Sequence, residues 1–166
     1  MGRPQEDRLT RLTEAVQHLL GRPQIIQTID RLKRDVGDSL GPFVWSVIGA
    51  DVDLSRLPAD IKSAWIFVLK KDTPSICHFH PHSIQHMAVI EGSGSAEIDG
   101  ARTPLQCFDT SKAIDSLWTV RDKNVPHEFF PDHTDMVVLS FHTCAADDLI
   151  EIECGTGRQR RYEAAP

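Results

Sequence analysis

The sequence predicts a mainly β protein with two N-terminal α-helices, and three observations carry this prediction. Apolar residues recur at helical spacing only before Gly41. From Phe43 onward, short segments rich in β-branched and aromatic residues follow one another at roughly 8–12 residue intervals, separated by Gly and Pro. The chain has 166 residues, 40% of them hydrophobic, which is enough for one domain with a hydrophobic core. Many short strands of this kind favour a β-sandwich or a small β-barrel.

Two amphipathic helices are expected at the start of the chain. Gly21 ends the first apolar stripe, and Pro23 suits the first turn of the second helix. Each stripe must be buried, either on one face of the sheet or against a second subunit in a homodimer, and the sequence leaves both alternatives open. The first stripe consists of Leu9, Leu12, Val16, Leu19 and Leu20, and the second of Ile25, Ile26, Ile29, Leu32 and Val36.

The expected strands follow in order along the rest of the chain. They are residues 43–48, 64–69, 75–80, 85–91, 95–98, 105–108, 117–120, 127–130 and 136–141. The dipeptide Asp99-Gly100 is a strong signal for a tight hairpin turn. We therefore expect an N-terminal helical extension over residues 1–41, a β-barrel over residues 42–154 and a loose C-terminal tail over residues 155–166.

Composition and charge argue against several classes of function. The net charge is −6, so no nucleic-acid partner is expected, and the short basic run at residues 158–161 is interpreted as a solvated tail. No apolar run is long enough to span a membrane, and the polar N-terminus carries no signal-peptide core, so no membrane association is expected. The widely spaced cysteines are interpreted as reduced thiols of a cytoplasmic protein. They are Cys77, Cys107, Cys144 and Cys154.

Three histidines carry the functional prediction. His78 and His80 are two residues apart in an expected strand, so both side chains point to the same face of the sheet. His127, from another strand of a closed sheet, would complete a site of three nitrogen ligands. Such a site would bind one divalent transition metal and leave coordination positions open, as catalytic metals require.

The spacing around these histidines resembles the first motif of the cupin superfamily. That motif has Gly, five residues, His-x-His, three or four residues, Glu, six residues and Gly. In this chain His78 and His80 are followed by Gln85 and Gly92 at the same spacing. Gln85 stands in place of the motif Glu, and Asp72 stands in place of the leading Gly.

The second cupin motif is matched mainly at His127. It ends in Pro-x-Gly, two residues, His, three residues and Asn, and its other positions are filled here by Asp122, Asn124 and Pro131. Asn124 occupies the Gly position, and Asn is the residue that best tolerates the left-handed backbone that Gly would supply. The resemblance covers residues 65–142 and implies a cupin-type double-stranded β-helix, or jelly-roll barrel, with the two helices outside it.

The resemblance also implies a function. Three-histidine cupins are typically dioxygenases that bind their substrate on Fe(II), so the chain resembles a mononuclear non-haem Fe(II) dioxygenase, with Zn, Ni or Mn as the other metals considered. Its substrate would be a small oxygenated organic molecule, such as a diketone or a hydroxylated aromatic acid. Gln85 is expected to orient the substrate or oxygen, as a weak fourth ligand or through a hydrogen bond. Two alternatives stay open: a non-redox isomerase, lyase or cyclase in which His86 or His142 moves a proton, and a barrel that binds a small molecule without catalysis.

Several further residues have expected places around the metal. His86 alternates with Gln85 and is expected on the opposite face unless a bulge turns it inward. Tyr162 lies beyond the last expected strand, which disfavours the thiol dioxygenases of this fold because they use a tyrosine near the iron. Arg102 and Arg121 could each meet a substrate carboxylate, but exposure to solvent is the stronger expectation. The residues expected to line the substrate pocket are Ile76, Met87, Trp118, Phe129 and His142.

Overall fold

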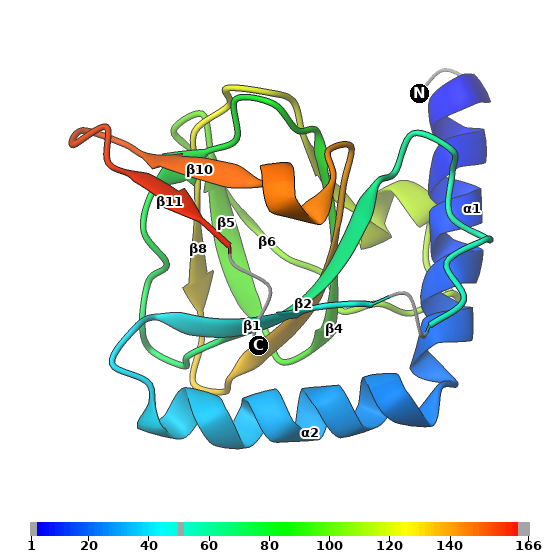
Figure 1. Ribbon diagram of the computed structural model, residues 1–166, viewed down its shortest axis with the longest axis horizontal. Helices are drawn as coiled ribbons and strands as arrows, with labels where there is room; N and C mark the ends of the chain where they lie inside the picture. The colour runs from blue at the N-terminus through cyan, green and yellow to red at the C-terminus, as the bar shows by residue number, and fades with distance from the viewer. Residues whose placement is uncertain (1–2, 50–51, 163–166) are drawn as a thin grey trace.

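The two α-helices come first in the chain, and the strands follow them (Figure 1). The computed structural model describes residues 3–49 and 52–162. Its α-helices are α1 (Arg3–Leu20) and α2 (Pro23–Asp38), and its short 3-10 helices are η1 (Ile114–Leu117) and η2 (Ala146–Asp148). Its strands are β1 (Phe43–Val47), β2 (Ser63–Leu69), β3 (His78–Phe79), β4 (Gln85–Glu91), β5 (Gly94–Ile98), β6 (Ala101–Pro104), β7 (Thr119–Arg121), β8 (His127–Pro131), β9 (Met136–His142), β10 (Ile150–Glu153) and β11 (Gln159–Arg161).

The strands form two antiparallel sheets whose order is that of a jelly roll. The first sheet has the order β1-β2-β9-β4-β7, and the second has the order β11-β10-β3-β8-β5-β6. The eight strands β2 to β9 are divided as β2-β9-β4-β7 and β3-β8-β5-β6, which is the arrangement of a two-sheet jelly roll. Strand β1 and the β10–β11 hairpin extend the two sheets at their edges. The predicted mainly β jelly roll with two N-terminal helices is confirmed.

Strand β2 shows why the central strands are almost continuously apolar. All seven of its residues are buried. Trp65 and Phe67 belong to the hydrophobic cluster between the two sheets, whereas Ile66 and Val68 belong to the cluster between the first sheet and the helices. A sheet that is covered on both faces needs apolar side chains on both, so an unbroken apolar run replaces the alternation of a half-exposed strand.

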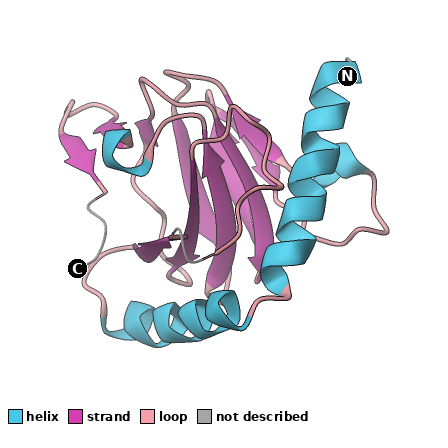
Figure 2. Cartoon of the chain, turned by 45° about the vertical axis from the view of Figure 1, so that its right-hand side comes forward, coloured by secondary structure: helices cyan, strands magenta, loops and turns pink. Residues whose placement is uncertain are grey.

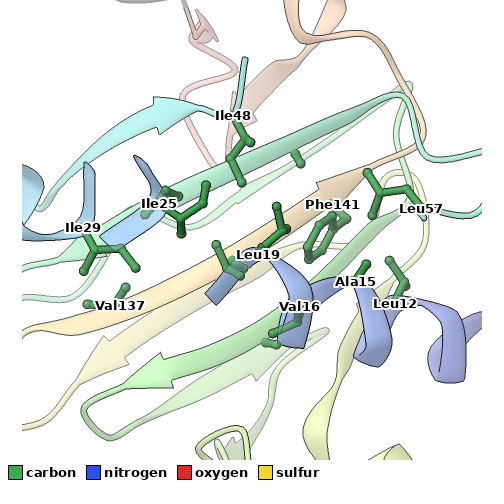
Figure 3. Packing of buried hydrophobic residues seen from close by; sticks show 14 of the residues in the cluster. Leu12, Ala15, Val16, Leu19, Ile25, Ile29, Ile48, Leu57, Val137 and Phe141 are labelled. Atoms are coloured by element: carbon green, nitrogen blue, oxygen red, sulfur yellow. The ribbon is translucent and has the colours of Figure 1, made fainter. Parts of the chain in front are cut away.

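The two helices cover the outer face of the first sheet, which resolves the alternative that the sequence leaves open (Figure 2). Figure 3 shows side chains of both helices, Val16 and Ile29 among them, packed toward that sheet, where Phe141 of β9 lies. Burying a side chain of this size contributes about 1.5–3 kcal/mol. Apart from Ile26, which is 48% exposed, the apolar stripes are thus covered within one chain and no longer argue for a homodimer. No described helix is long and apolar enough to cross a membrane.

The predicted Asp99-Gly100 turn is present, and it changes where the next strand begins. Both residues have positive φ, +49° for Asp99 and +78° for Gly100, as a two-residue hairpin turn requires. The pairing resumes at once with Ile98 opposite Ala101, so β6 takes the place of the strand expected at residues 105–108, where the structure has an isolated bridge between Cys107 and Val89. All of β6 is exposed, and an exposed edge strand carries no apolar pattern by which it could be recognised.

The C-terminal segment also differs from the loose tail that the sequence predicts. Residues 159–161 form β11, which pairs with β10, and Tyr162 is only 4% exposed. Strand β11 is short and polar, so backbone pairing and the burial of one aromatic ring hold it without any local sequence signal. The last four expected tail residues, 163–166, lie outside the described residues.

Two cysteines form a disulfide bond, so the expectation of reduced thiols is wrong for them. Cys77 and Cys154 are bonded, with their Cα atoms 5.4 Å apart. Among the described residues, Cys107 and Cys144 are free. The bonded pair is separated by 77 residues, and sequence spacing alone cannot reveal a pairing that the fold creates. Closing so long a loop in the unfolded chain stabilises the fold by up to about 4.5 kcal/mol.

Candidate metal centre

The structure brings the three predicted histidines together between the sheets. His78 of β3 lies directly opposite His127 of β8 in the second sheet, and His80 follows at the end of β3. All three are buried, and one nitrogen from each lies within 4.8 Å of the others. The ring centroids of His78 and His127 are 4.4 Å apart, and that of His80 is 5.2 Å from His78 and 5.4 Å from His127. The convergence that the sequence predicts is therefore present.

Backbone carbonyls orient each of the three rings. The Nδ1 atoms of His78, His80 and His127 lie 2.6, 2.9 and 2.9 Å from the carbonyl oxygens of Ile76, Ile150 and Val125 respectively. A carbonyl oxygen can only accept, so each Nδ1 carries the proton and each Nε2 presents a lone pair. In the described part of the chain, Nε2 of His80 and of His127 has no hydrogen-bond partner. Buried lone pairs that converge without donors fit a divalent cation, with the second nitrogens held as in known metal sites.

Burial keeps these imidazoles neutral, which is the form that binds metal. Burial lowers the pKa of His78 and of His80 to about 4. Burial also lowers the pKa of His127 well below its usual value, and the positive charge of Arg121 adds to this. The site is therefore ready to accept a cation at neutral pH without releasing protons from these rings.

A left-handed residue shapes the turn that leads into His127, as the sequence predicts. Asn124 has a φ of +62°, and its backbone N–H donates to the carbonyl of His80 at 3.0 Å. This turn places the Val125 carbonyl where it accepts from His127. Asp72, at the leading Gly position of the first motif, also has a positive φ of +53°. Both departures from the cupin motif thus preserve the backbone that Gly would adopt.

Gln85 is buried in the site, but hydrogen bonds hold both ends of its amide. Its Nε2 donates to Ser140 Oγ at 2.9 Å, and its Oε1 accepts from Arg121 Nη1 at 2.9 Å. Arginine can only donate, so the amide oxygen must face Arg121. Gln85 therefore positions Arg121, and in this arrangement its oxygen is not directed to a metal as a fourth ligand would be.

Arg121 is the first functional residue that the sequence interpretation misplaces. The sequence predicts that Arg102 and Arg121 are exposed to solvent. Arg102 is exposed, but Arg121 is only 2% exposed. Its guanidinium lies 4.5 Å from the centre of the Phe129 ring, and its Nε and Nη2 have no hydrogen-bond partner among the described residues. Burial lowers its pKa to about 9, so it is still charged at neutral pH. A signal existed: Trp118 and Val120 are apolar, so alternation turns Arg121 to the other face of its strand.

The C-terminal hairpin brings three further polar side chains to the site. Glu151 of β10 is 4% exposed, and its Oε2 lies 3.5 Å from Nε2 of His78. Arg160 Nε donates to its Oε1 at 3.0 Å, and the Tyr162 hydroxyl donates to its Oε2. Burial, together with the charge of Glu151, raises the pKa of Tyr162 well above its usual value. Tyr162 therefore lies at the site. This removes the argument against thiol dioxygenases, which rested on the position of Tyr162 beyond the last expected strand.

A small cavity lies beside the imidazoles between the two sheets. Its volume is about 30 Å³, room for about two water molecules. The predicted pocket residues Met87, Phe129 and His142 line it together with Tyr162, but Ile76 and Trp118 do not. Ile76 contributes its carbonyl to His78 instead. Trp118 packs on the helix side of the first sheet, where its indole N–H donates to Thr13 of α1 at 3.0 Å.

The remaining histidines do not present a free nitrogen to the cavity. His142 is buried, and its Nδ1 and Nε2 lie 3.1 and 2.9 Å from the hydroxyls of Ser83 and Ser140. His86 lies on the opposite face from Gln85, beside α1, in regular pairing with Val120 and Phe141. The alternation argument for His86 is therefore correct, and no bulge turns it toward the metal centre.

Comparison with known structures shows the same fold in salicylate 1,2-dioxygenase from Pseudaminobacter salicylatoxidans. A structure of a single-residue variant has a TM-score of 0.57 at 14% identity, over 78% of this chain and 39% of that chain. The adduct with gentisate has a TM-score of 0.57 at 16% identity, over 78% and 36%. A further structure of the enzyme gives 0.53 at 13% identity, over 70% and 33%.

These neighbours are cupin-fold proteins, so the resemblance that the histidine motif indicates is confirmed as a likeness of fold. The identities are too low to show more than the fold. The chain spans well under half of the length of these dioxygenases. No protein-family model matches the sequence, and no curated protein matches it.

Proposed function

We propose that this chain binds one divalent transition metal, foremost Fe(II), through His78, His80 and His127. We further propose that it is a mononuclear non-haem dioxygenase of a small oxygenated substrate. The observation that carries the proposal is the convergence of three buried imidazoles, each of which offers one ring nitrogen within 4.8 Å of the others. When bound, Fe(II) supplies a Lewis-acidic centre with open positions and redox chemistry with dioxygen.

Arg121 indicates that the substrate carries a carboxylate. An unpaired buried cation costs free energy, and Arg121 keeps two N–H donors without partners among the described residues. A carboxylate is the planar acceptor that a guanidinium binds with two hydrogen bonds. Gln85 and the Phe129 ring hold the guanidinium in place. Arg121 would therefore orient the substrate, while the metal takes its other oxygen atoms.

The walls of the cavity favour a compact substrate. Apart from the histidines and Gln85, apolar side chains dominate the lining, and these exclude water from the reacting atoms. With a volume of about 30 Å³, the cavity must widen before a ring-sized molecule can enter. The likeness to salicylate 1,2-dioxygenase, one structure of which contains gentisate, supports a small hydroxylated acid as the substrate class.

The non-redox alternative has less support from the side chains that were expected to serve it. It requires an acid–base group in the cavity, and neither His86 nor His142 offers a free nitrogen there. A barrel that binds a small carboxylate without turning it over would use the same histidines and the same Arg121. Activity measurements separate this last alternative from the dioxygenase.

The test begins with the metal content of the purified protein and continues with oxygen uptake. Apo protein is loaded with Fe(II), Mn(II), Ni(II) or Zn(II) and offered hydroxylated aromatic acids, the matching catechols without a carboxylate, and diketones. We expect stoichiometric metal, and oxygen uptake only with Fe(II) and a carboxylate-bearing substrate. Tight binding of the acids without oxygen uptake would favour a protein that binds a small carboxylate without catalysis. Turnover with Zn(II) would favour the non-redox enzyme.

A further inference from the structure

We propose that Glu151 is a fourth protein ligand of the metal, a carboxylate that the C-terminal hairpin supplies. The inference rests on the proposed metal site and extends it to a strand outside both cupin motifs. Among the described residues, Glu151 is the carboxylate that forms a close contact with one of the three histidines, because its Oε2 lies 3.5 Å from Nε2 of His78.

The first argument is the chemistry of that contact. The Ile76 carbonyl occupies Nδ1 of His78, so Nε2 is the nitrogen left for a metal, and this is the atom that faces Glu151. A carboxylate oxygen and an imidazole lone pair are both acceptors, and a shared cation satisfies both. Two cis ligands with bonds of about 2.1 Å are about 3.0 Å apart. The separation of 3.5 Å is therefore already close to the spacing of neighbouring ligands.

The second argument is that the carboxylate is held in place. Glu151 is 4% exposed. Arg160 occupies its Oε1, and the Tyr162 hydroxyl donates to Oε2, the oxygen that also faces His78. Charged hydrogen bonds of this kind fix a ligand before the metal arrives, as outer partners do in known metal sites.

The third argument is that the backbone ties the hairpin to the histidine strand. Strand β10 pairs with β3, with Ile152 opposite Phe79 and Glu153 opposite His78. The disulfide between Cys77 and Cys154 closes the end of this pairing, one residue before His78 in the sequence. Figure 1 shows the hairpin β10–β11 on the side of the sheets away from α1. Glu151 therefore cannot leave the neighbourhood of His78 without disrupting β10.

The fourth argument is charge. The cupin motif has a Glu at the position of Gln85, and Gln85 is instead engaged with Arg121 and Ser140. A divalent ion held by three neutral imidazoles would keep its full charge beside the cationic Arg121. Glu151, which also pairs with Arg160, would bring a negative charge to the ion from β10 of the second sheet. Four protein ligands leave two of six positions for small molecules in an octahedral site.

The experiment measures metal binding directly, in the full-length protein without substrate. Apo wild type, Glu151→Gln and Glu153→Gln are titrated with Zn(II) against a competing chelator, and the visible spectrum of the Co(II) form is recorded. Glu153 is the matched control because it lies on the same strand and pairs with Arg158. We expect Glu151→Gln to weaken Zn(II) affinity about 10- to 100-fold and to change the Co(II) spectrum. Glu153→Gln should do neither.

The outcomes separate this proposal from the function on which it rests. Wild-type affinity and an unchanged Co(II) spectrum in Glu151→Gln would overturn the ligand assignment while leaving the three-histidine site intact. A wild type that binds no metal would overturn both. If Glu151→Gln does not fold, Glu151→Asp serves instead, because it keeps the charge but withdraws it by one methylene. Weaker binding in that variant supports direct ligation, and unchanged binding overturns it.

Discussion

The candidate metal centre has two walls that differ in how the sequence encodes them. One wall consists of β3, the residue His80 that follows it, and β8, and it carries His78, His80 and His127 at the spacing of a known motif. The other is the hairpin β10–β11 with the residue after it, which carries Glu151 and Tyr162 in a segment without recognisable pattern. The difference shows that the candidate metal-binding histidines can be predicted from local spacing in the sequence. The residues that enclose them are placed by pairing between distant segments of the chain, which local spacing does not reveal.

The largest expected effect is loss of the metal when the histidine wall is broken. In His80→Ala only two of the three imidazoles remain beside Glu151, and such a reduced set holds a divalent ion much less tightly than the complete one. We expect metal content after dialysis to fall from about one equivalent to near zero. His82→Ala is the matched control because His82 is exposed and only two residues away. Stoichiometric metal in His80→Ala would contradict the assignment of His80 as a ligand. It would indicate that residues of the second wall contribute more to metal binding than His80 does.

Acid should destabilise the apo protein through the histidine wall. Burial lowers the pKa of His78 and His80 to about 4, from an unfolded value of 6.5. The unfolded chain therefore takes up protons below pH 6.5 that the folded chain refuses, so stability is complete above pH 6.5 and is lost as the pH falls toward 4. Each such histidine contributes a slope of about 1.4 kcal/mol per pH unit inside that window.

Urea unfolding of the apo protein at pH 7.5, 6.5 and 5.5 measures this slope. A free energy of unfolding that stays constant from pH 6.5 to 5.5 would show that the histidine wall is protonated or hydrated in solution. Saturating metal should keep this slope and extend it to lower pH, since ligated imidazoles also refuse the protons that the unfolded chain takes up.

Much of this fold and part of this site are predictable from local sequence. The helical stripes, the Asp99-Gly100 turn and the left-handed Asn124 depend on neighbours in the chain, so the sequence predicts them. Arg121 could have been placed by alternation, because Trp118 and Val120 face the helices. The remaining features depend on contacts between distant segments. They are the disulfide, strand β11, the exposed strand β6 and the contact of Glu151 with His78.

The disulfide tests how firmly the second wall is fixed to the first. Replacing Cys77 and Cys154 by Ser removes a covalent loop of 77 residues, which should lower the free energy of unfolding by up to about 4.5 kcal/mol. Metal affinity should fall as well, because β10 and Glu151 are then held to β3 by backbone pairing alone. Cys107→Ser, at an exposed free thiol, is the control. Equal stability of the double variant and wild type in urea would show that the hairpin holds without the bond.

The smallest effect expected concerns Arg121, which belongs to neither wall and for which we propose contact with a substrate carboxylate. Arg121→Met keeps much of the length and apolar stem of the side chain but removes a buried cation that lacks partners for two of its donors. The stability of the apo protein should change little, because removing the buried charge is offset by the loss of the donor to Gln85 Oε1 and of the contact with the Phe129 ring.

Carboxylate substrates should lose about 1.5–3 kcal/mol of binding in Arg121→Met, or roughly 10- to 100-fold in kcat/KM, because that range is typical for hydrogen bonds to charged groups. Substrates without a carboxylate should be affected much less, and the ratio between the two classes is the quantity to measure. Arg102→Met, at an exposed arginine over the Phe130 ring, provides the reference. An equal loss of kcat/KM for both classes of substrate would mean that Arg121 supports the structure of the site and does not bind the substrate carboxylate.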